Sequence, residues 1–324
     1  MKYSFFWIGI AIAVVLAFAT PHVITNEFYI RTAYTVLQFV VLATAWNILG
    51  GYAGYVNFGA AAFFAAGAYT SVFIYKLFPL FQVPEWMIFI MLPAGGIVAA
   101  LLGLMTGALT LRLRGVYFSI ATLALAIVLQ TLVTNWHFVG GAKGASILPP
   151  RDVPLDFIFN GYADFLFVLM AFLAIAALVI ARYIETSWIG RGLAAIRDNE
   201  DAAECMGVPT LKLKLFATTV SGFLFGVAGA PLPYFINYIE PVSGFSLIYA
   251  VNALAMPMIG GATTWIGPLL GATVLGTAQE VARVVISSEM NLLIVGVLLV
   301  FFVVAAPDGF VGLIRKYFGK GGRR

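Results

Sequence analysis

Few residues of this 324-residue sequence have side chains suited to covalent or metal chemistry, and their spacing keeps them apart. Cys205 is the single cysteine, so no intrachain disulfide can form, and its neighbours do not suggest a nucleophile. The two histidines, His22 and His137, are distant in sequence, and no H-E-x-x-H or C-x-x-C pattern occurs. We therefore predict no catalytic residue, no metal site and no cofactor.

Nucleotide binding by the chain itself is also not expected. The sequence has no G-x-x-x-x-G-K-[ST] pattern, which forms the phosphate-binding loop of many ATPases. Its one Gly-Lys pair, Gly319-Lys320, is followed by neither Ser nor Thr.

Charged side chains are nearly missing from the long apolar runs of the sequence. Ion-coupled carriers usually need such charges within the bilayer, although each costs at least about 2.5–3.5 kcal/mol to insert. The exception is Glu280 with Arg283, whose i, i+3 spacing favours a self-neutralising pair, with a pair lining a pathway as the alternative. If the protein transports a solute, the sequence indicates that the energy comes from another component.

The longest polar stretch between apolar runs covers residues 182–214 and carries the signals of a short helix. Asp198 is suited to be its N-cap, with Asp201 at the N3 position. Gly207 is suited to the position after its last residue. These signals predict a helix over 199–206.

This predicted helix has a small apolar face formed by Ala202, Ala203 and Met206. Such a face is suited to a groove on a partner protein. The alternative is a helix that lies on the bilayer surface or packs on its own bundle.

Two glycine-rich stretches, 47–59 and 260–268, are predicted to interrupt helices. The first has four glycines in ten residues, and each glycine costs about 1 kcal/mol in a helix relative to alanine. Non-helical backbone at membrane depth is tolerated where protein buries it or where it faces a water-filled cavity. Two tight turns between packed helices are the alternative. The candidate pathway residues are Asn47, Gly50, Gly51, Tyr52, Tyr55, Asn57, Gly260, Gly261 and Thr263.

The composition indicates that transmembrane helices carry the candidate residues named above. Apolar residues make up 62% of the chain and charged residues 10%, and the mean hydropathy is +1.00. These values exclude a water-soluble globule, a disordered chain and a nucleic-acid-binding protein, and they indicate membrane lipid as the solvent. We predict an all-α, polytopic transmembrane bundle of about ten spans (eight to ten). The predicted spans are 4–20, 32–49, 56–75, 87–110, 116–135, 163–181, 215–236, 246–259, 268–286 and 291–306.

The distribution of basic residues predicts the orientation. With both termini in the cytoplasm, thirteen of the 18 Lys and Arg residues lie inside and five outside, which fits the positive-inside rule. The predicted domains are a transmembrane domain over 1–306, with a cytoplasmic loop over 185–214 inserted, and a basic tail over 307–324. The first span is expected to be retained, and a signal peptide cleaved near Ala19 is the alternative.

Several segments, in order along residues 40–310, resemble the permeases of branched-chain amino-acid ABC transporters, and in particular their M-type subunit. Asn57 and the stretch 262–265 depart from the family pattern, which leaves the exact substrate open. The segments that carry the resemblance are 50–54, 57–64, 67–69, 111–118, 121–123, 140–144, 190–207, 221–230 and 260–272.

The resemblance implies a permease subunit of a binding-protein-dependent importer in the bacterial inner membrane. Its partners would be an H-type permease subunit, two ATP-binding subunits and an extracytoplasmic solute-binding protein. A permease for urea or short amides, or an ATP-independent carrier or channel, is the alternative. The residues implied to couple the bundle to ATP hydrolysis are Arg191, Ala194, Arg197, Asp198, Glu200, Ala202, Ala203, Met206 and Gly207.

Overall fold

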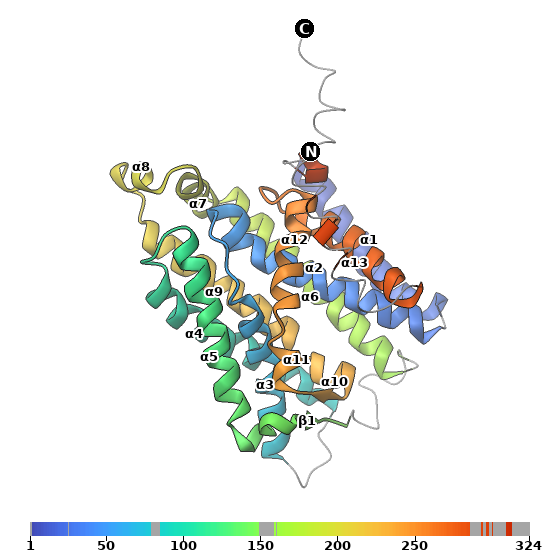
Figure 1. Ribbon diagram of the computed structural model, residues 1–324. Coiled ribbons are helices and arrows are strands. Elements are labelled where there is room, and N and C mark those ends of the chain that lie inside the picture. The colour runs from blue at the N-terminus through green and yellow to red at the C-terminus, as the bar shows by residue number, and fades with distance from the viewer. Residues whose placement is uncertain are drawn as a thin grey trace.

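Helices dominate the described part of the chain (Figure 1). The structure is a computed structural model that describes residues 2–24, 26–78, 85–148, 159, 161–285 and 309–312 and the isolated positions 293, 296, 297 and 300. Its long helices are α1 (Lys2–Val23), α2 (Glu27–Ala53), α3 (Ala60–Leu77), α4 (Ile88–Thr110), α5 (Val116–Thr134), α6 (Tyr162–Thr186), α9 (Thr210–Gly229), α12 (Leu247–Gly260) and α13 (Ile266–Val285). The shorter elements are η1 (Glu85–Met87), η2 (His137–Val139), η3 (Gly141–Lys143), α7 (Trp188–Asp198), α8 (Glu200–Cys205), α10 (Leu232–Ile236), α11 (Pro241–Gly244) and the strands β1 (Ala145–Ser146) and β2 (Tyr238–Ile239).

Eight segments of the described chain are long and apolar enough to cross a membrane, which confirms the all-α polytopic bundle. The first six predicted spans correspond to α1 to α6. The seventh is broken in two, into α9 and α10, and the eighth corresponds to α12, which the short helix α11 precedes. The ninth predicted span corresponds to α13, which is not one of the eight segments found long and apolar enough to cross a membrane. The tenth, 291–306, lies outside the described residues apart from the four isolated positions, and the predicted tail lies outside them apart from 309–312.

Helix α2 passes through the centre of the bundle, with α6, α9, α12 and α13 around it. Its buried Gln38 side chain donates a hydrogen bond to the backbone oxygen of Ala228 in α9, 3.3 Å away. Helices α3 and α9 approach closely, because a Cβ atom on Gly67 would lie only 2.0 Å from the carbonyl oxygen of Gly226. Small residues at such crossings are typical of helices that pack in lipid.

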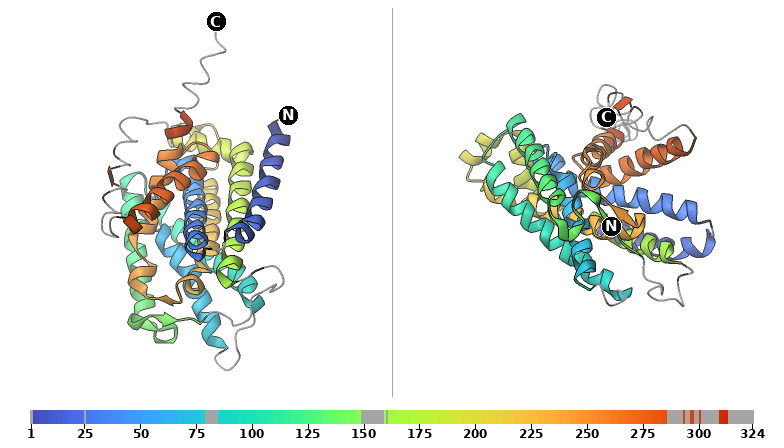
Figure 2. Two further views of the ribbon diagram at one scale, coloured as in Figure 1. Left: turned by 90° about the vertical axis from the view of Figure 1, so that its right-hand side faces the viewer. Right: turned by 60° about the horizontal axis from the view of Figure 1, so that its bottom comes forward.

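Helix α1 lies at the edge of the bundle, beside α6 (Figure 2). The rings of Phe18 and Phe172 are 5.6 Å apart. Near the other end of α1, the Arg182 guanidinium lies 3.7 Å from the centre of the Phe6 ring. These contacts join α1 to α6 along its length.

The two ends of the bundle carry different elements. Helices α7 and α8 lie at the top in Figure 1, at the same end as the first residues of α1. At the opposite end, β1 pairs antiparallel with β2, with Ala145 opposite Ile239. This bridge joins the connection between α5 and α6 to the connection between α10 and α11.

Candidate functional site

The short helix α8 forms where the sequence predicts one, but its cap differs. Asn199, not Asp198, is the N-cap, because its side-chain oxygen accepts a hydrogen bond from the Ala202 backbone N–H at 3.0 Å. Asp198 is instead the last residue of α7, a helix that begins at Trp188. The prediction for Gly207 is confirmed: it follows the C-cap in the left-handed region, at φ 83°.

The predicted apolar face of α8 is divided between two sides of the helix. Ala203 is only 5% exposed and packs toward the bundle, whereas Ala202 is exposed and Met206 is 84% exposed. Glu200 also points inward, toward α9. The prediction of one face that includes Ala203 is therefore wrong. The small apolar residues of α8 could be recognised in the sequence, but which side of α8 packs against the bundle could not.

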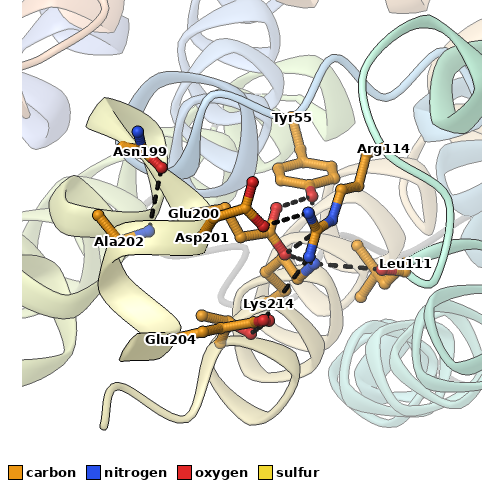
Figure 3. Close-up of polar contacts among 10 residues, drawn as sticks. Tyr55, Leu111, Arg114, Asn199, Glu200, Asp201, Ala202, Glu204 and Lys214 are labelled. Atoms are coloured by element: carbon orange, nitrogen blue, oxygen red, sulfur yellow. Dashed lines mark hydrogen bonds and ion pairs between the residues drawn. The ribbon is translucent and has the colours of Figure 1, made fainter. Parts of the chain in front are cut away.

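Lys214 of α9 joins α8 to the bundle (Figure 3). Its side chain is 3% exposed, and its ammonium donates to Glu200 Oε1 at 2.6 Å, to the Tyr55 hydroxyl at 3.1 Å and to the Leu111 carbonyl at 3.1 Å. These three acceptors use all three donors of the ammonium. The Tyr55 hydroxyl in turn donates to Glu200 Oε2. We call Tyr55, Leu111, Arg114, Glu200 and Lys214 the Lys214 cluster.

Arg114 lies on the solvent-exposed side of this cluster. It forms an ion pair with Asp201, and its guanidinium lies 3.9 Å from Glu200 Oε1 and 3.6 Å from Glu204 Oε2. Because its side chain is half exposed, these pairs contribute little stability on their own. They place a positive charge over the acidic first turn of α8, which orients the helix.

The cluster keeps Glu200 ionised. Burial alone would raise the pKa of Glu200, but hydrogen bonds from Lys214 and Tyr55 and the charges of Lys214 and Arg114 outweigh burial and lower it. Burial, and then the hydrogen bond to Glu200, raise the pKa of Tyr55, so its hydroxyl stays protonated at neutral pH. The ionised Glu200 carboxylate and the protonated Tyr55 hydroxyl are therefore the stable forms of these two groups at neutral pH.

We expect the stability of Glu200→Gln to differ from that of the wild type in its dependence on pH. Because the folded-state pKa of Glu200 lies below its unfolded value of about 4.3, the ionised group stabilises the fold at neutral pH. That contribution is lost as the pH falls through the folded-state pKa. Thermal unfolding in detergent should show the wild type more stable at pH 7 and the two proteins converging as the pH falls through the lowered pKa of Glu200. Glu204→Gln, at a half-exposed side chain, is the control, and parallel profiles for Glu200→Gln and wild type would contradict the expectation.

Helix α7 contacts the C-terminal end of α2. The Arg197 guanidinium donates to the Gly51 carbonyl at 3.2 Å, and its aliphatic stem lies against Gly54. Of the other predicted coupling residues in α7, Arg191 and Asp198 are exposed and Ala194 is part-buried.

The first predicted break is shorter than the sequence suggests. Helix α2 continues through Gly50 and Gly51 to Ala53 and ends at Gly54, which is left-handed at φ 77°. Tertiary packing outweighs the helix cost of the two glycines, because a Cβ on Gly51 would lie 2.2 Å from the Ala262 carbonyl oxygen. The prediction that Gly50 and Gly51 interrupt the helix is wrong, and the break covers 54–59.

Residues 54–59 form a turn, and helix side chains pair with three of its backbone polar groups. The Ser119 hydroxyl of α5 donates to the Val56 carbonyl at 2.8 Å, and the Phe58 N–H donates to the Thr122 hydroxyl at 3.3 Å. The Trp46 indole N–H donates to the Asn57 carbonyl at 3.1 Å. The contacts with Ser119 and Thr122, which lie inside α5, place this non-helical backbone within the bundle, where it must find protein partners.

The second predicted break is confirmed. Helix α12 ends at Gly260, Gly261 has φ 121°, and α13 begins at Ile266. The Asn47 amide donates to the Thr264 carbonyl at 3.3 Å.

A carboxylate joins this second break to α2 and α6. Glu185 Oε2 accepts from the Trp265 N–H at 2.6 Å and lies 3.5 Å from the Tyr52 hydroxyl. The second break is thus connected through side chains to the C-terminal part of α2 and to α6, at the end of the bundle that carries α7 and α8.

The candidate pathway residues other than the glycines lie in four different places. Asn47 and Tyr52 are buried in packed protein at this end, and Thr263 is exposed on the α12–α13 turn. Tyr55 belongs to the Lys214 cluster. Asn57 lines a small cavity between α3, α4 and α5.

The predicted pair in α13 is present. Arg283 Nη1 lies 2.9 Å from Glu280 Oε1, and the neighbouring Gln279 donates to Asn252 Oδ1 in α12 at 3.0 Å.

The chain matches a known family of membrane proteins. The model of a family described as the permease component of branched-chain amino acid transport systems matches residues 28–303. The chain belongs to this family. It is therefore a multi-pass membrane protein that serves as a transport component, and the resemblance to the M-type permeases is confirmed.

Relatives of this permease come from several transport systems. The high-affinity branched-chain amino acid transport system permease protein LivM of Escherichia coli is 27% identical, over 93% of this chain and 74% of LivM. The probable branched-chain amino acid transport permease protein LivH of Methanocaldococcus jannaschii is 26% identical, over 79% of this chain and 83% of its own. The ribose import permease protein RbsC of Haemophilus influenzae is 26% identical, over 70% of this chain and 71% of RbsC. No solved structure matches the chain significantly.

Sequence reasoning missed several residues of this permease that hold the site together. From the sequence, Lys214 contributes only to the predicted orientation, Arg114 and Thr122 enter otherwise only as members of the segments 111–118 and 121–123 that carry the resemblance, and Ser119 has no assigned role. One signal for Lys214 was available: a lysine in the second turn of an apolar helix needs a nearby carboxylate or carbonyl.

Proposed function

We propose that the chain is the M-type permease subunit of an ATP-driven, binding-protein-dependent importer for branched-chain or related amino acids. The names of the LivM and LivH relatives support this solute class. A paired H-type permease, two ATP-binding subunits and an extracytoplasmic solute-binding protein complete the transporter. The partner subunits hydrolyse ATP, and this chain contributes part of the passage.

In this proposal the end with α7 and α8 faces the cytoplasm of a bacterial cell, together with both termini. The charge distribution supports this orientation, because thirteen of the 18 Lys and Arg residues then lie inside. The solute-binding protein then approaches the end with the β1–β2 bridge.

The observation that carries the coupling role is the arrangement of α8. One side is fixed to α9 and to the 54–59 turn through the Lys214 cluster, and the other side presents Ala202 and Met206 to solvent. A helix that is rigidly joined to the bundle and exposes an apolar side chain is suited to a groove on an ATP-binding subunit. Movement of that subunit is then transmitted to the packed helices as a rigid-body shift.

Reconstitution tests the proposed function. Proteoliposomes with the complete transporter and its binding protein should accumulate leucine only when ATP and both ATP-binding subunits are present. Leucine accumulation by the permeases alone, driven by an ion gradient, would instead identify a secondary carrier.

Met206→Glu tests the docking surface of α8. Because Met206 is 84% exposed, the charge should leave the melting temperature unchanged but weaken contact with the ATP-binding subunit, lowering leucine uptake by about tenfold, which corresponds to about 1.4 kcal/mol of contact. Met206→Leu, which keeps an apolar side chain, is the control. Equal uptake by the two variants at equal expression would contradict the docking role.

A further inference from the structure

A cavity of about 480 Å³ lies where the end of α1 meets the starts of α2 and α6 and the connection between α10 and β2. These four segments contribute Pro21, Arg31, Asp164 and Asn237 to its lining. Because Asn237 directly precedes β2, the cavity is at the end of the bundle that carries the β1–β2 bridge. Its size is within the range of about 300–1,000 Å³ found for cavities that hold small ligands.

Asp164 lines this cavity with a carboxylate that lacks a partner. The residue is 9% exposed, and its side chain forms no hydrogen bond or ion pair with any described residue. The exposed His22 of α1 is near enough to act on this carboxylate electrostatically but forms no ion pair with it. The start of a helix favours a negative charge, but an exposed acid in the same turn of α6 would have that benefit without the cost of burial. Since buried carboxylates normally have a partner, Asp164 points to a positively charged ligand.

The other charged residues of the cavity lining, Glu27 and Arg31, pair with each other. Arg31 Nε and Nη2 both donate to Glu27 Oε1, at 2.9 and 2.7 Å. This pair is neutral, so the described lining of the cavity has one uncompensated charge, the negative charge of Asp164. The Nη1 amino group of Arg31 donates to no described residue and remains available to an anionic group. The lining is therefore suited to a ligand that carries an ammonium beside an anion.

The cavity lies at the edge of the bundle, where lipid is the neighbour. Helix α1, whose last turn contributes to the lining, is on the outside of the bundle beside α6, and most of its side chains are not buried (Figure 2). Phe28 and Tyr29, which follow Glu27 at the start of α2, are also exposed. Aromatic residues at the end of a membrane helix are typical of the level of the lipid headgroups. Headgroups are therefore expected beside the cavity.

We propose that this cavity binds the headgroup of phosphatidylethanolamine, with the lipid ammonium on Asp164 and the lipid phosphate beside Arg31. A primary ammonium has three N–H donors for the carboxylate, whereas the quaternary ammonium of phosphatidylcholine has none. An amino acid also carries a primary ammonium, but the position of the cavity at the edge of the bundle favours the lipid as its source. The site does not depend on the proposed transport function.

Lipid retention by the full-length chain tests this site. The chain, purified in detergent, is supplied with equal amounts of dioleoyl-phosphatidylethanolamine and dioleoyl-phosphatidylcholine, and the retained lipids are counted by native mass spectrometry. We expect the wild type to retain at least about fivefold more phosphatidylethanolamine than phosphatidylcholine, and Asp164→Asn to lose this preference. Glu240→Gln, which makes the same change of charge at the same end of the bundle but outside the cavity, should keep it.

A second measurement varies the lipid and needs no variant of the protein. Thermal unfolding of the wild type is followed with added phosphatidylethanolamine, its N-methyl and N,N-dimethyl derivatives, and phosphatidylcholine. Because a ligand that binds the folded state stabilises it, the rise in melting temperature should decrease stepwise as methyl groups replace the N–H donors.

Three outcomes overturn the inference. If the wild type retains both lipids equally, or if the methylated series has no effect, the cavity does not select a primary ammonium. If Asp164→Asn keeps the wild-type preference, phosphatidylethanolamine binds elsewhere on the protein. If saturating free leucine displaces phosphatidylethanolamine from the wild type, the cavity belongs to the solute and not to the lipid.

Discussion

Lys214→Met is expected to abolish coupled uptake. The substitution removes a buried ammonium that satisfies Glu200, Tyr55 and the Leu111 carbonyl at once. Removing one partner of a buried ion pair costs about 3–5 kcal/mol, because the remaining charge stays buried without a counter-ion. Here that cost falls on the attachment of α8, so α8 should detach from the bundle while the membrane helices remain folded.

The measurement combines transport with local protection. ATP-dependent leucine uptake by the reconstituted transporter should fall by more than about tenfold, and amide hydrogen exchange over residues 199–209 should accelerate. Lys212→Met removes an exposed lysine two residues away and is the matched control. Adding Glu200→Gln to Lys214→Met should restore part of the protection, because the buried carboxylate is then neutral. Wild-type uptake by Lys214→Met would show that the cluster has no role in coupling.

Gly271→Ala is expected to be the most destabilising single-methyl change in the described membrane helices. A Cβ at this position would lie 1.7 Å from the Met256 carbonyl oxygen and 3.0 Å from the Gly260 N–H nitrogen. Both atoms are backbone, so no side-chain rotation relieves the clash, and α12 and α13 must separate. Overpacking of a tight core costs roughly 1–3 kcal/mol, and more where the backbone has to move.

Gly276→Ala on the same helix is the matched control. Its new Cβ would contact Val36 at 3.5 Å, an ordinary packing distance, and alanine is the better helix former by up to about 1 kcal/mol. Thermal unfolding of the purified chain in detergent should therefore place Gly271→Ala well below the wild type and Gly276→Ala at or above it. Similar melting temperatures for the two variants would contradict the close approach of α12 and α13.

The membrane helices could be predicted from the sequence, because lipid requires long apolar runs whatever their neighbours are. The end of α8 before Gly207 and the break after Gly260 could also be predicted, since both depend on local backbone conformation. The N-cap of α8 could not, because Asp198 and Asn199 have nearly equal capping preferences. Which of the two is used depends on how far α7 extends.

The candidate site was less predictable because its contacts join segments that are distant in sequence. Tyr55 and Lys214 are separated by 159 positions, and no local pattern reports that pairing. Gly50 and Gly51 suggested a broken helix, whereas Gly51 instead allows the α12–α13 turn to approach α2. Glycine content indicates that something unusual occurs at a position, but only the neighbouring backbone decides between a break and a close contact.

The central position of α2 has a consequence for biogenesis. Its Gln38 and Asn47 amides find their partners 190 and 217 positions later in the chain. During synthesis, α2 therefore enters the bilayer with the Gln38 and Asn47 amides lacking their final acceptors. These hydrogen bonds form only after the second half of the polypeptide has been inserted. The two halves of the chain cannot mature as independent units, and a nascent fragment that ends before α9 would be a substrate for membrane quality control.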